Sequence, residues 1–137
     1  MKSTNTIVDK LKTYEWDYFV TLTYKRKVCD GEIQKMMNRF TQHPHITGWV
    51  WVREFTSLLY PHLHLLLKLS DMKKYHRVKY YLEEMGDVHF VKYDKTQEGV
   101  SYTLKTYGSH NDLWDMKQPP LSINQKLKLR YYEYNNR

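Results

Sequence analysis

The sequence has little cysteine and no long apolar run, and both shortages limit the class of protein. Cys29 is the single cysteine among 137 residues, so an internal disulfide is excluded and a reducing, cytoplasmic setting fits. No apolar stretch approaches the roughly 20 residues that cross a bilayer. Residues 1–12 also lack the apolar core of a signal peptide. We therefore expect no membrane partner.

The residues that are present favour an anionic partner. Lysine and arginine number 22 against 15 aspartate and glutamate residues, which gives a formal net charge of +7. Nucleic acid is the partner that such a charge favours. The 13 tyrosines and 4 tryptophans could stack on bases, although many of them are expected in strands and in the core.

Hydrophobic periodicity predicts an α+β fold in one domain. Strand and helix patterns alternate along the chain, with Asp71 as the expected N-cap and Gly86 as the expected C-cap of the second helix. The order β-α-β-β-α-β-α is typical of a ferredoxin-like antiparallel sheet with helices packed on it. The expected strands cover residues 16–24, 47–57, 59–70 and 87–94, and the expected helices cover residues 32–42, 71–86 and 96–108.

Two histidines interrupt the leucine-rich third strand. His62 and His64 are two residues apart, so their side chains share one face, while the leucines at 63, 65 and 67 share the other. Two neutral imidazoles side by side offer two nitrogen lone pairs to a metal ion. The alternative is a pair of structural histidines that bond to backbone or water, and for an arbitrary pair this alternative is favoured.

Glu54 is the residue that shifts this balance. It precedes His62 by eight residues, so a hairpin that closes around Leu58 with an odd-length loop places all three side chains on one face. An even-length loop would instead face Glu54 toward Leu63, unless a bulge corrected the register. Two histidines and one carboxylate leave open positions, which suits a catalytic ion. Alternatively, Glu54 is an exposed carboxylate paired with a lysine or arginine.

A tyrosine and a lysine stand three residues apart in the last expected helix. Tyr102 and Lys105 therefore lie on one helical face. Tyrosine can act as a covalent nucleophile, and a nearby ammonium favours the phenolate or neutralises phosphate charge. An exposed pair on an amphipathic helix is the alternative. Tyr107 is about half a turn out of phase, so we expect a single nucleophilic tyrosine.

Three short segments resemble, in this order, the motifs of a known superfamily. They are "FVTLTY" at 19–24, "PHLHLLL" at 61–67 and "YTLK" at 102–105. Together they resemble the HUH endonucleases, specifically the rolling-circle replication initiators of small plasmids and viruses. The resemblance spans residues 16–108 and implies an antiparallel sheet of about five strands with helices.

The resemblance implies a chemistry and a partner. A divalent ion, Mn²⁺ or Mg²⁺, would be held by Glu54, His62 and His64 and would polarise a phosphate of single-stranded DNA at a replication origin, with a hairpin as one form of it. Tyr102 would attack, become linked to the 5′-phosphate and free a 3′-hydroxyl. Lys105 would position the phosphate or compensate its charge. No small-molecule cofactor is implied, and the setting would be the cytoplasm of a host cell.

Two departures from the initiators stand out. The chain has no G-x-x-x-x-G-K-[ST] phosphate loop, so it corresponds to a stand-alone nuclease or to the nuclease domain of a longer protein. Within a single domain over 1–137, the basic, tyrosine-rich C-terminal segment 109–137 has no counterpart in the motif core. It could bind DNA, pair two protomers or pack on the sheet, and packing is favoured.

Other assignments are weaker. Lys25, Arg26 and Lys27 follow the first motif, and we expect them to contact the DNA backbone. One alternative function is a single-tyrosine HUH transposase, although such proteins usually carry a glutamine ligand on the tyrosine helix. Another is a non-catalytic module that binds single-stranded nucleic acid. The remaining histidines are expected at the surface or in structural roles, and the tryptophans of the second strand in the core: His43, His45, His76, His89 and His110, with Trp49 and Trp51.

Overall fold

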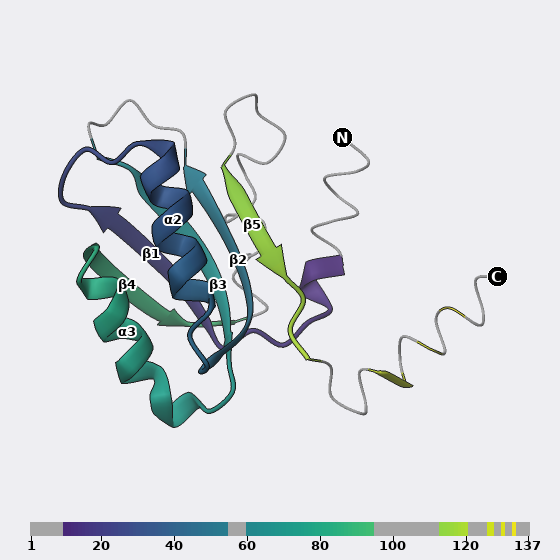
Figure 1. Ribbon diagram of the computed structural model, residues 1–137. Helices are drawn as coiled ribbons and strands as arrows, with labels where there is room; N and C mark the ends of the chain where they lie inside the picture. Colours follow the sequence, from purple (N-terminus) through teal and green to yellow (C-terminus); the bar gives the residue numbers. More distant parts are fainter. Residues whose placement is uncertain are drawn as a thin grey trace.

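A single antiparallel sheet organises the chain. The computed structural model describes residues 10–54, 60–94 and 113–120, with the isolated positions 126, 127, 130 and 133. Five strands follow the order β4-β1-β3-β2-β5, and α2 and α3 lie on one face of the sheet (Figure 1). This α+β architecture confirms the expected ferredoxin-like fold. The elements are β1 (Tyr18–Tyr24), α2 (Asp30–Thr41), β2 (Ile46–Glu54), β3 (His62–Leu69), the 3₁₀ helix η1 (Met72–Lys74), α3 (Tyr75–Glu83), β4 (Gly86–Lys92) and β5 (Trp114–Lys117).

The central strand β3 is buried on both of its faces. Leu63, Leu65 and Leu67 are fully buried on the face that carries the helices. Leu66 is fully buried on the opposite face. A strand covered on both sides reads as a continuous apolar run, which explains the leucine-rich sequence. The histidines near its first residue are exceptions to this rule.

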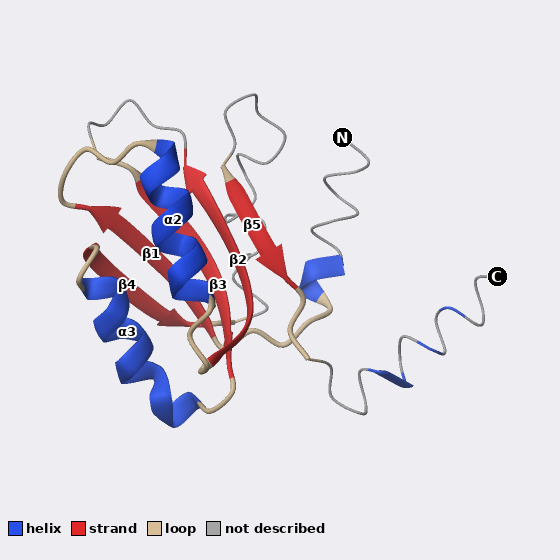
Figure 2. Cartoon of the chain, viewed as in Figure 1, coloured by secondary structure: helices blue, strands red, loops and turns tan. Residues whose placement is uncertain are grey.

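Helices α2 and α3 are amphipathic, and their apolar sides cover one face of the sheet (Figure 2). Spacings of three and four residues put Ile33, Met37 and Phe40 on one side of α2. Val78 and Leu82 hold the equivalent place on α3. All five side chains are fully buried in the main core. Each such burial stabilises the fold by about 1.5–3 kcal/mol before entropy is subtracted.

The N-terminal segment covers part of the other face of the sheet. Leu11, Tyr14 and Trp16 are buried there and pack in a second core with Val50 and Leu66. The Trp16 indole N–H donates to the carbonyl of Leu11 at 3.0 Å, which satisfies its polar group inside this apolar layer. This second core lies toward the end of the sheet opposite to the polar residues of the site.

A buried carboxylate ties the start of β1 to the end of β3. The Asp17 side chain accepts from the backbone N–H of Leu69 at 2.7 Å and from the Lys68 ammonium at 3.3 Å. Its backbone carbonyl accepts from Tyr93 N–H at 2.9 Å. These bonds hold the ends of three strands together and satisfy a charge that is 8% exposed.

The fifth strand comes from the segment that the sequence left without a clear role. Strand β5 pairs antiparallel with β2, as packing on the sheet would require. The Trp49 indole N–H donates to the Asp115 carboxylate at 3.2 Å, and the Lys117 ammonium lies 5.6 Å from the centre of the Trp49 ring. After β5, Pro119 lies so close to Gly48 that a Cβ there would meet it at 2.6 Å.

The second expected helix, 71–86, is shorter than its sequence pattern. Asp71 is an N-cap as expected, because its carboxylate accepts from the Lys73 N–H at 2.9 Å. The expected C-cap at Gly86 is wrong, since α3 ends at Glu83 and Gly86 opens β4. A glycine is needed here because the β4 backbone passes against β1. A Cβ would lie 2.9 Å from Tyr24 Cα and closer still to the Thr23 carbonyl oxygen.

Two further points concern the extent of the fold. None of the helices in the described part of the chain has the length and apolar character needed to cross a bilayer. The expected helix over 96–108, with Tyr102 and Lys105, lies outside the described residues.

The close approach at Gly86 predicts a stability difference between two glycines. Gly86→Ala should lower the free energy of unfolding by about 2 kcal/mol or more, because backbone atoms must move to admit the methyl group. Gly31→Ala is the matched control: no atom lies within 4 Å of a Cβ there, and alanine is favoured in a helix by up to about 1 kcal/mol. Urea denaturation of the two variants measures the difference, and equal midpoints would contradict it.

Candidate functional site

The pairing of β2 with β3 brings the sequence-predicted ligands to one face. Glu54 lies directly across from His62, so the hairpin has the register that an odd-length loop predicts. On the other side of β3, Thr23 of β1 pairs with His62 and Thr21 pairs with His64. Directly paired residues point to the same side of a sheet. Glu54 and both histidines therefore lie on the face opposite to the helices.

Glu54 and His64 are in direct contact. The Nε2 atom of His64 is 2.7 Å from a carboxylate oxygen of Glu54. Because a carboxylate only accepts, the imidazole carries its proton on Nε2 in this arrangement. The His64 side chain is 5% exposed and the Glu54 side chain 22% exposed, so the pair is largely shielded from water. The His64 ring also stacks on Phe19, with ring centres 5.9 Å apart and planes 8° apart.

His62 is held by a different partner. Its Nδ1 atom lies 3.0 Å from the Thr23 hydroxyl oxygen across the β1–β3 ladder. The other ring nitrogen, Nε2, is then the one left to meet a ligand. When the hydroxyl accepts from Nδ1–H, Nε2 keeps its lone pair, which is the tautomer that binds a metal ion. Thr23 belongs to the first motif, whose link to the site is thus a specific hydrogen bond.

The donor set can be tested against a divalent ion. One carboxylate and two imidazoles on a shared face are chemically suited to such an ion, with positions left for substrate. Among the residues that the structure describes, however, no group of three His, Cys, Asp or Glu side chains converges on one point. The Glu54–His64 hydrogen bond accounts for this. An ion would replace the proton on His64 Nε2, and metal binding at such sites releases protons.

The edge strand β4 extends the polar face beyond β1. Thr21 pairs with His89 and Thr23 pairs with Asp87, so these side chains continue the rows that contain His64 and His62. His89 was expected to have only a surface or structural role. Its register with Thr21 is set by long-range pairing of β4 with β1, and the sequence around it carries no signal of that pairing.

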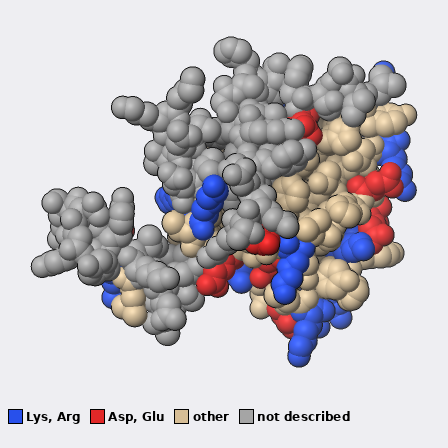
Figure 3. Space-filling view, turned by 180° about the vertical axis from the view of Figure 1, so that it is seen from behind, with Lys and Arg blue, Asp and Glu red and all other residues tan. Residues whose placement is uncertain are grey.

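The cations expected to contact DNA are partly engaged with acidic neighbours. The Lys25 ammonium lies 3.5 Å from the Asp87 carboxylate, and Arg26 pairs with Glu32 at 2.9 Å. Both pairs are exposed, and such pairs contribute between about 0 and 1 kcal/mol. Viewed from the sheet face, blue and red side chains alternate along one edge of the molecule (Figure 3). The contact of Lys25, Arg26 and Lys27 with DNA stays a prediction.

Tyr24 can be excluded as the nucleophile, although it is adjacent to Thr23. Its side chain points to the helix-covered face and is 1% exposed. Burial raises the pKa of its phenol to about 12, so the phenolate is strongly disfavoured. The Trp51 side chain is buried in the same core and Trp49 is packed against it, as the sequence predicted. The expected nucleophile, Tyr102, lies outside the described residues.

The hydrogen bond between Thr23 and His62 predicts a change in the imidazole. Thr23→Val removes the hydroxyl while keeping the branched shape, and should lower the free energy of unfolding by about 1 kcal/mol. The ring ¹⁵N signals of His62 should shift in long-range ¹H–¹⁵N spectra, whereas Thr23→Ser should leave them near their original positions. Unchanged His62 signals in the valine variant would show that the bond does not set the ring.

One solved structure resembles the fold. It is the crystal structure of the hypothetical protein ORF119 from Sulfolobus islandicus rod-shaped virus 1, with a TM-score of 0.51 and 23% sequence identity. The match covers 78% of this chain and 96% of the viral protein. At this identity the likeness concerns the fold alone. None of the curated proteins compared is significantly similar to the chain.

A family profile identifies the wider group. The profile of the replication-associated protein ORF2 family matches residues 17–111, which is well over half of the chain. The matched segment begins just before β1 and includes Glu54, His62 and His64. The chain therefore belongs to this family of replication-associated proteins.

Proposed function

We propose that this chain is a metal-dependent endonuclease and strand transferase of the HUH superfamily, which nicks and rejoins single-stranded DNA at a replication origin. The observation that carries the proposal is the register that pairs Glu54 with His62 and brings Glu54 against His64. Membership of a replication-associated family gives this site a biological context.

Glu54, His62 and His64 would hold a divalent ion, Mn²⁺ or Mg²⁺. When bound, the ion would supply positive charge to a phosphate oxygen and so stabilise the transition state. The residues around it prepare the site. Thr23 orients the His62 ring, and Phe19 keeps the His64 ring in its plane. The shielded Glu54–His64 pair keeps water from competing for the carboxylate.

Tyr102 would carry the covalent step. Its phenolic oxygen would attack phosphorus, the bond from phosphorus to the 3′-oxygen would break, and the 3′-oxygen would leave as a hydroxyl after taking up a proton. The 5′-phosphate would remain linked to Tyr102 until the reverse reaction joined it to a 3′-hydroxyl. Lys105, three residues further on, would balance the phosphate charge. Both roles rest on the "YTLK" motif.

A non-catalytic module for single-stranded nucleic acid is the second candidate. Its support is that Glu54 and His64 bond to each other and that the described residues hold no converged three-ligand group. In that case both histidines would be structural, and the exposed polar rows on β4 would contact the strand. A cleavage assay separates the two candidates.

A covalent adduct is the expected signature of the enzyme. Incubated with Mn²⁺ and single-stranded DNA from a candidate origin, the wild type should form a protein–DNA adduct that survives denaturing electrophoresis. Tyr102→Phe should abolish it, because no other group replaces the nucleophile. Tyr24→Phe is the matched control and should keep full adduct formation, since Tyr24 is buried in the core.

Two outcomes would count against this assignment. An adduct that persists in Tyr102→Phe would move the nucleophile elsewhere. DNA binding without an adduct under Mn²⁺ and Mg²⁺ would favour the non-catalytic module.

Metal affinity provides a measurement that does not depend on cleavage. Glu54→Gln should weaken Mn²⁺ binding by roughly 100-fold, because loss of a charged ligand exceeds the 10- to 100-fold effect typical of outer-shell partners. Glu83→Gln removes one carboxylate from α3, away from the site, and should bind Mn²⁺ as the wild type does. Isothermal titration calorimetry gives both constants. Equal constants for the two variants would remove Glu54 from the ligand set.

A further inference from the structure

A group of cations lies at the end of the molecule where α3 begins. Lys73 and Lys74 belong to η1, and Arg77 lies in the first turn of α3. We call these three residues the α3 basic patch. The turn that contains His43 and His45 adjoins it, because the N–H of Ser70, just before η1, donates to the His45 carbonyl at 2.9 Å.

The patch differs from the other cations in lacking acidic partners. Among the described residues, no carboxylate lies within ion-pairing distance of Lys73, Lys74 or Arg77. By contrast, Lys25 and Arg26 are both paired. The acid nearest in sequence is Asp71, and its carboxylate is occupied by the backbone N–H of Lys73. Positive charge at this end is therefore not balanced by the described part of the chain.

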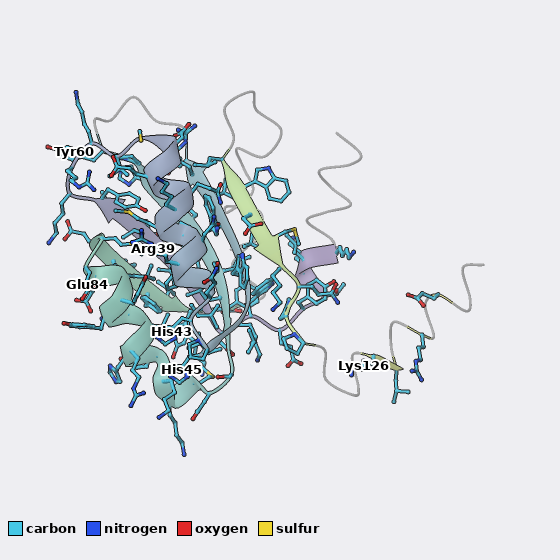
Figure 4. All side chains as sticks on the ribbon, viewed as in Figure 1. Arg39, His43, His45, Tyr60, Glu84 and Lys126 are labelled. Atoms are coloured by element: carbon cyan, nitrogen blue, oxygen red, sulfur yellow. The ribbon has the colours of Figure 1, made fainter. Side chains whose placement is uncertain are left out.

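Neighbouring imidazoles add to the same surface. The His43 and His45 rings are 4.9 Å apart and lie between the end of α2 and the start of α3 (Figure 4). The pKa of His43 is lowered by burial first, and then by the positive charges of His45 and Arg77. Arg77 is thus close enough to His43 to repel a second charge. An anion bound here would relieve that repulsion.

The patch lies in a different layer from the candidate site. Val78 and Leu82 pack α3 on the helix-covered face of the sheet, whereas His62 and His64 lie on the opposite face. A strand bound at the histidines cannot also lie along the outer side of α3. Lys and Arg side chains project from the lower end of the molecule in the view of Figure 3, where α3 begins.

We propose that the α3 basic patch binds the phosphate backbone of nucleic acid, at a segment separate from the strand at the histidines. Three cations that no described carboxylate pairs, gathered where η1 meets α3, would contact adjacent phosphates without reading bases. The inference rests on the proposed function in taking nucleic acid as the partner. It adds a second contact surface, which would fix the position of the substrate relative to the site.

Binding measured in EDTA tests the patch without any cleavage. Labelled hairpin and unstructured single-stranded DNA of equal length are titrated by fluorescence anisotropy at several salt concentrations. Arg77→Gln should weaken binding roughly 5- to 10-fold at about 0.1 M salt and reduce the salt slope by about 0.9 for duplex or 0.7 for single strand. The double variant Lys73→Gln/Arg77→Gln should lose about twice that slope.

Lys35→Gln is the matched control, because it removes one exposed charge from α2. Glutamine is a good helix former, so thermal unfolding should be unchanged in all variants. A larger effect of Arg77→Gln on the hairpin supports contact with duplex, and an equal effect on both DNAs supports contact with a single strand. Equal effects of Arg77→Gln and Lys35→Gln would overturn the proposal. Binding through the patch with no covalent adduct would leave the patch standing and overturn the nuclease.

Discussion

The register of one hairpin decides what this protein can do. Because side chains alternate across a strand, a shift of a single residue between β2 and β3 would turn Glu54 away from His62 and expose leucines instead. The leucines of β3 oppose such a shift, since they fill the core under the helices. The same burial that stabilises the fold thus fixes the geometry of the polar face. Chemistry here depends on packing that lies on the far side of the strand.

The two faces of the sheet have separate tasks. One face is covered by α2 and α3 and supplies most of the apolar core. The other is covered by the N-terminal segment only in part, so its polar rows can meet a substrate. Thr23 links the tasks, because its strand neighbours Leu22 and Tyr24 are buried while its hydroxyl reaches His62. A rigid apolar layer beneath a polar row is a favourable support for precise ligand positions.

The sequence predicted the fold well where periodicity is long and local. The strand around "FVTLTY", the amphipathic helices and the parity of His62, Leu63 and His64 all follow from patterns of two or of three and four residues. Strand β5 was missed because four residues are too short to show alternation, and it forms through Trp49 and Asp115 on another strand. The Glu54–His64 bond could not be foreseen either, since it depends on side-chain rotamers. The roles of Tyr102 and Lys105 stay predictions from sequence.

The outer strand β5 has a consequence for the protein as a solute. A sheet edge with free N–H and C=O groups can recruit a strand from another chain, and proteins limit this by keeping edge strands short or by placing proline near them. Strand β5 has four residues and is followed by Pro119 and Pro120, the first of which closes against Gly48. This border of the sheet is therefore a poor template for fibrous self-association. A protein that must display a polar sheet face to its substrate can do so here without inviting copies of itself at that border.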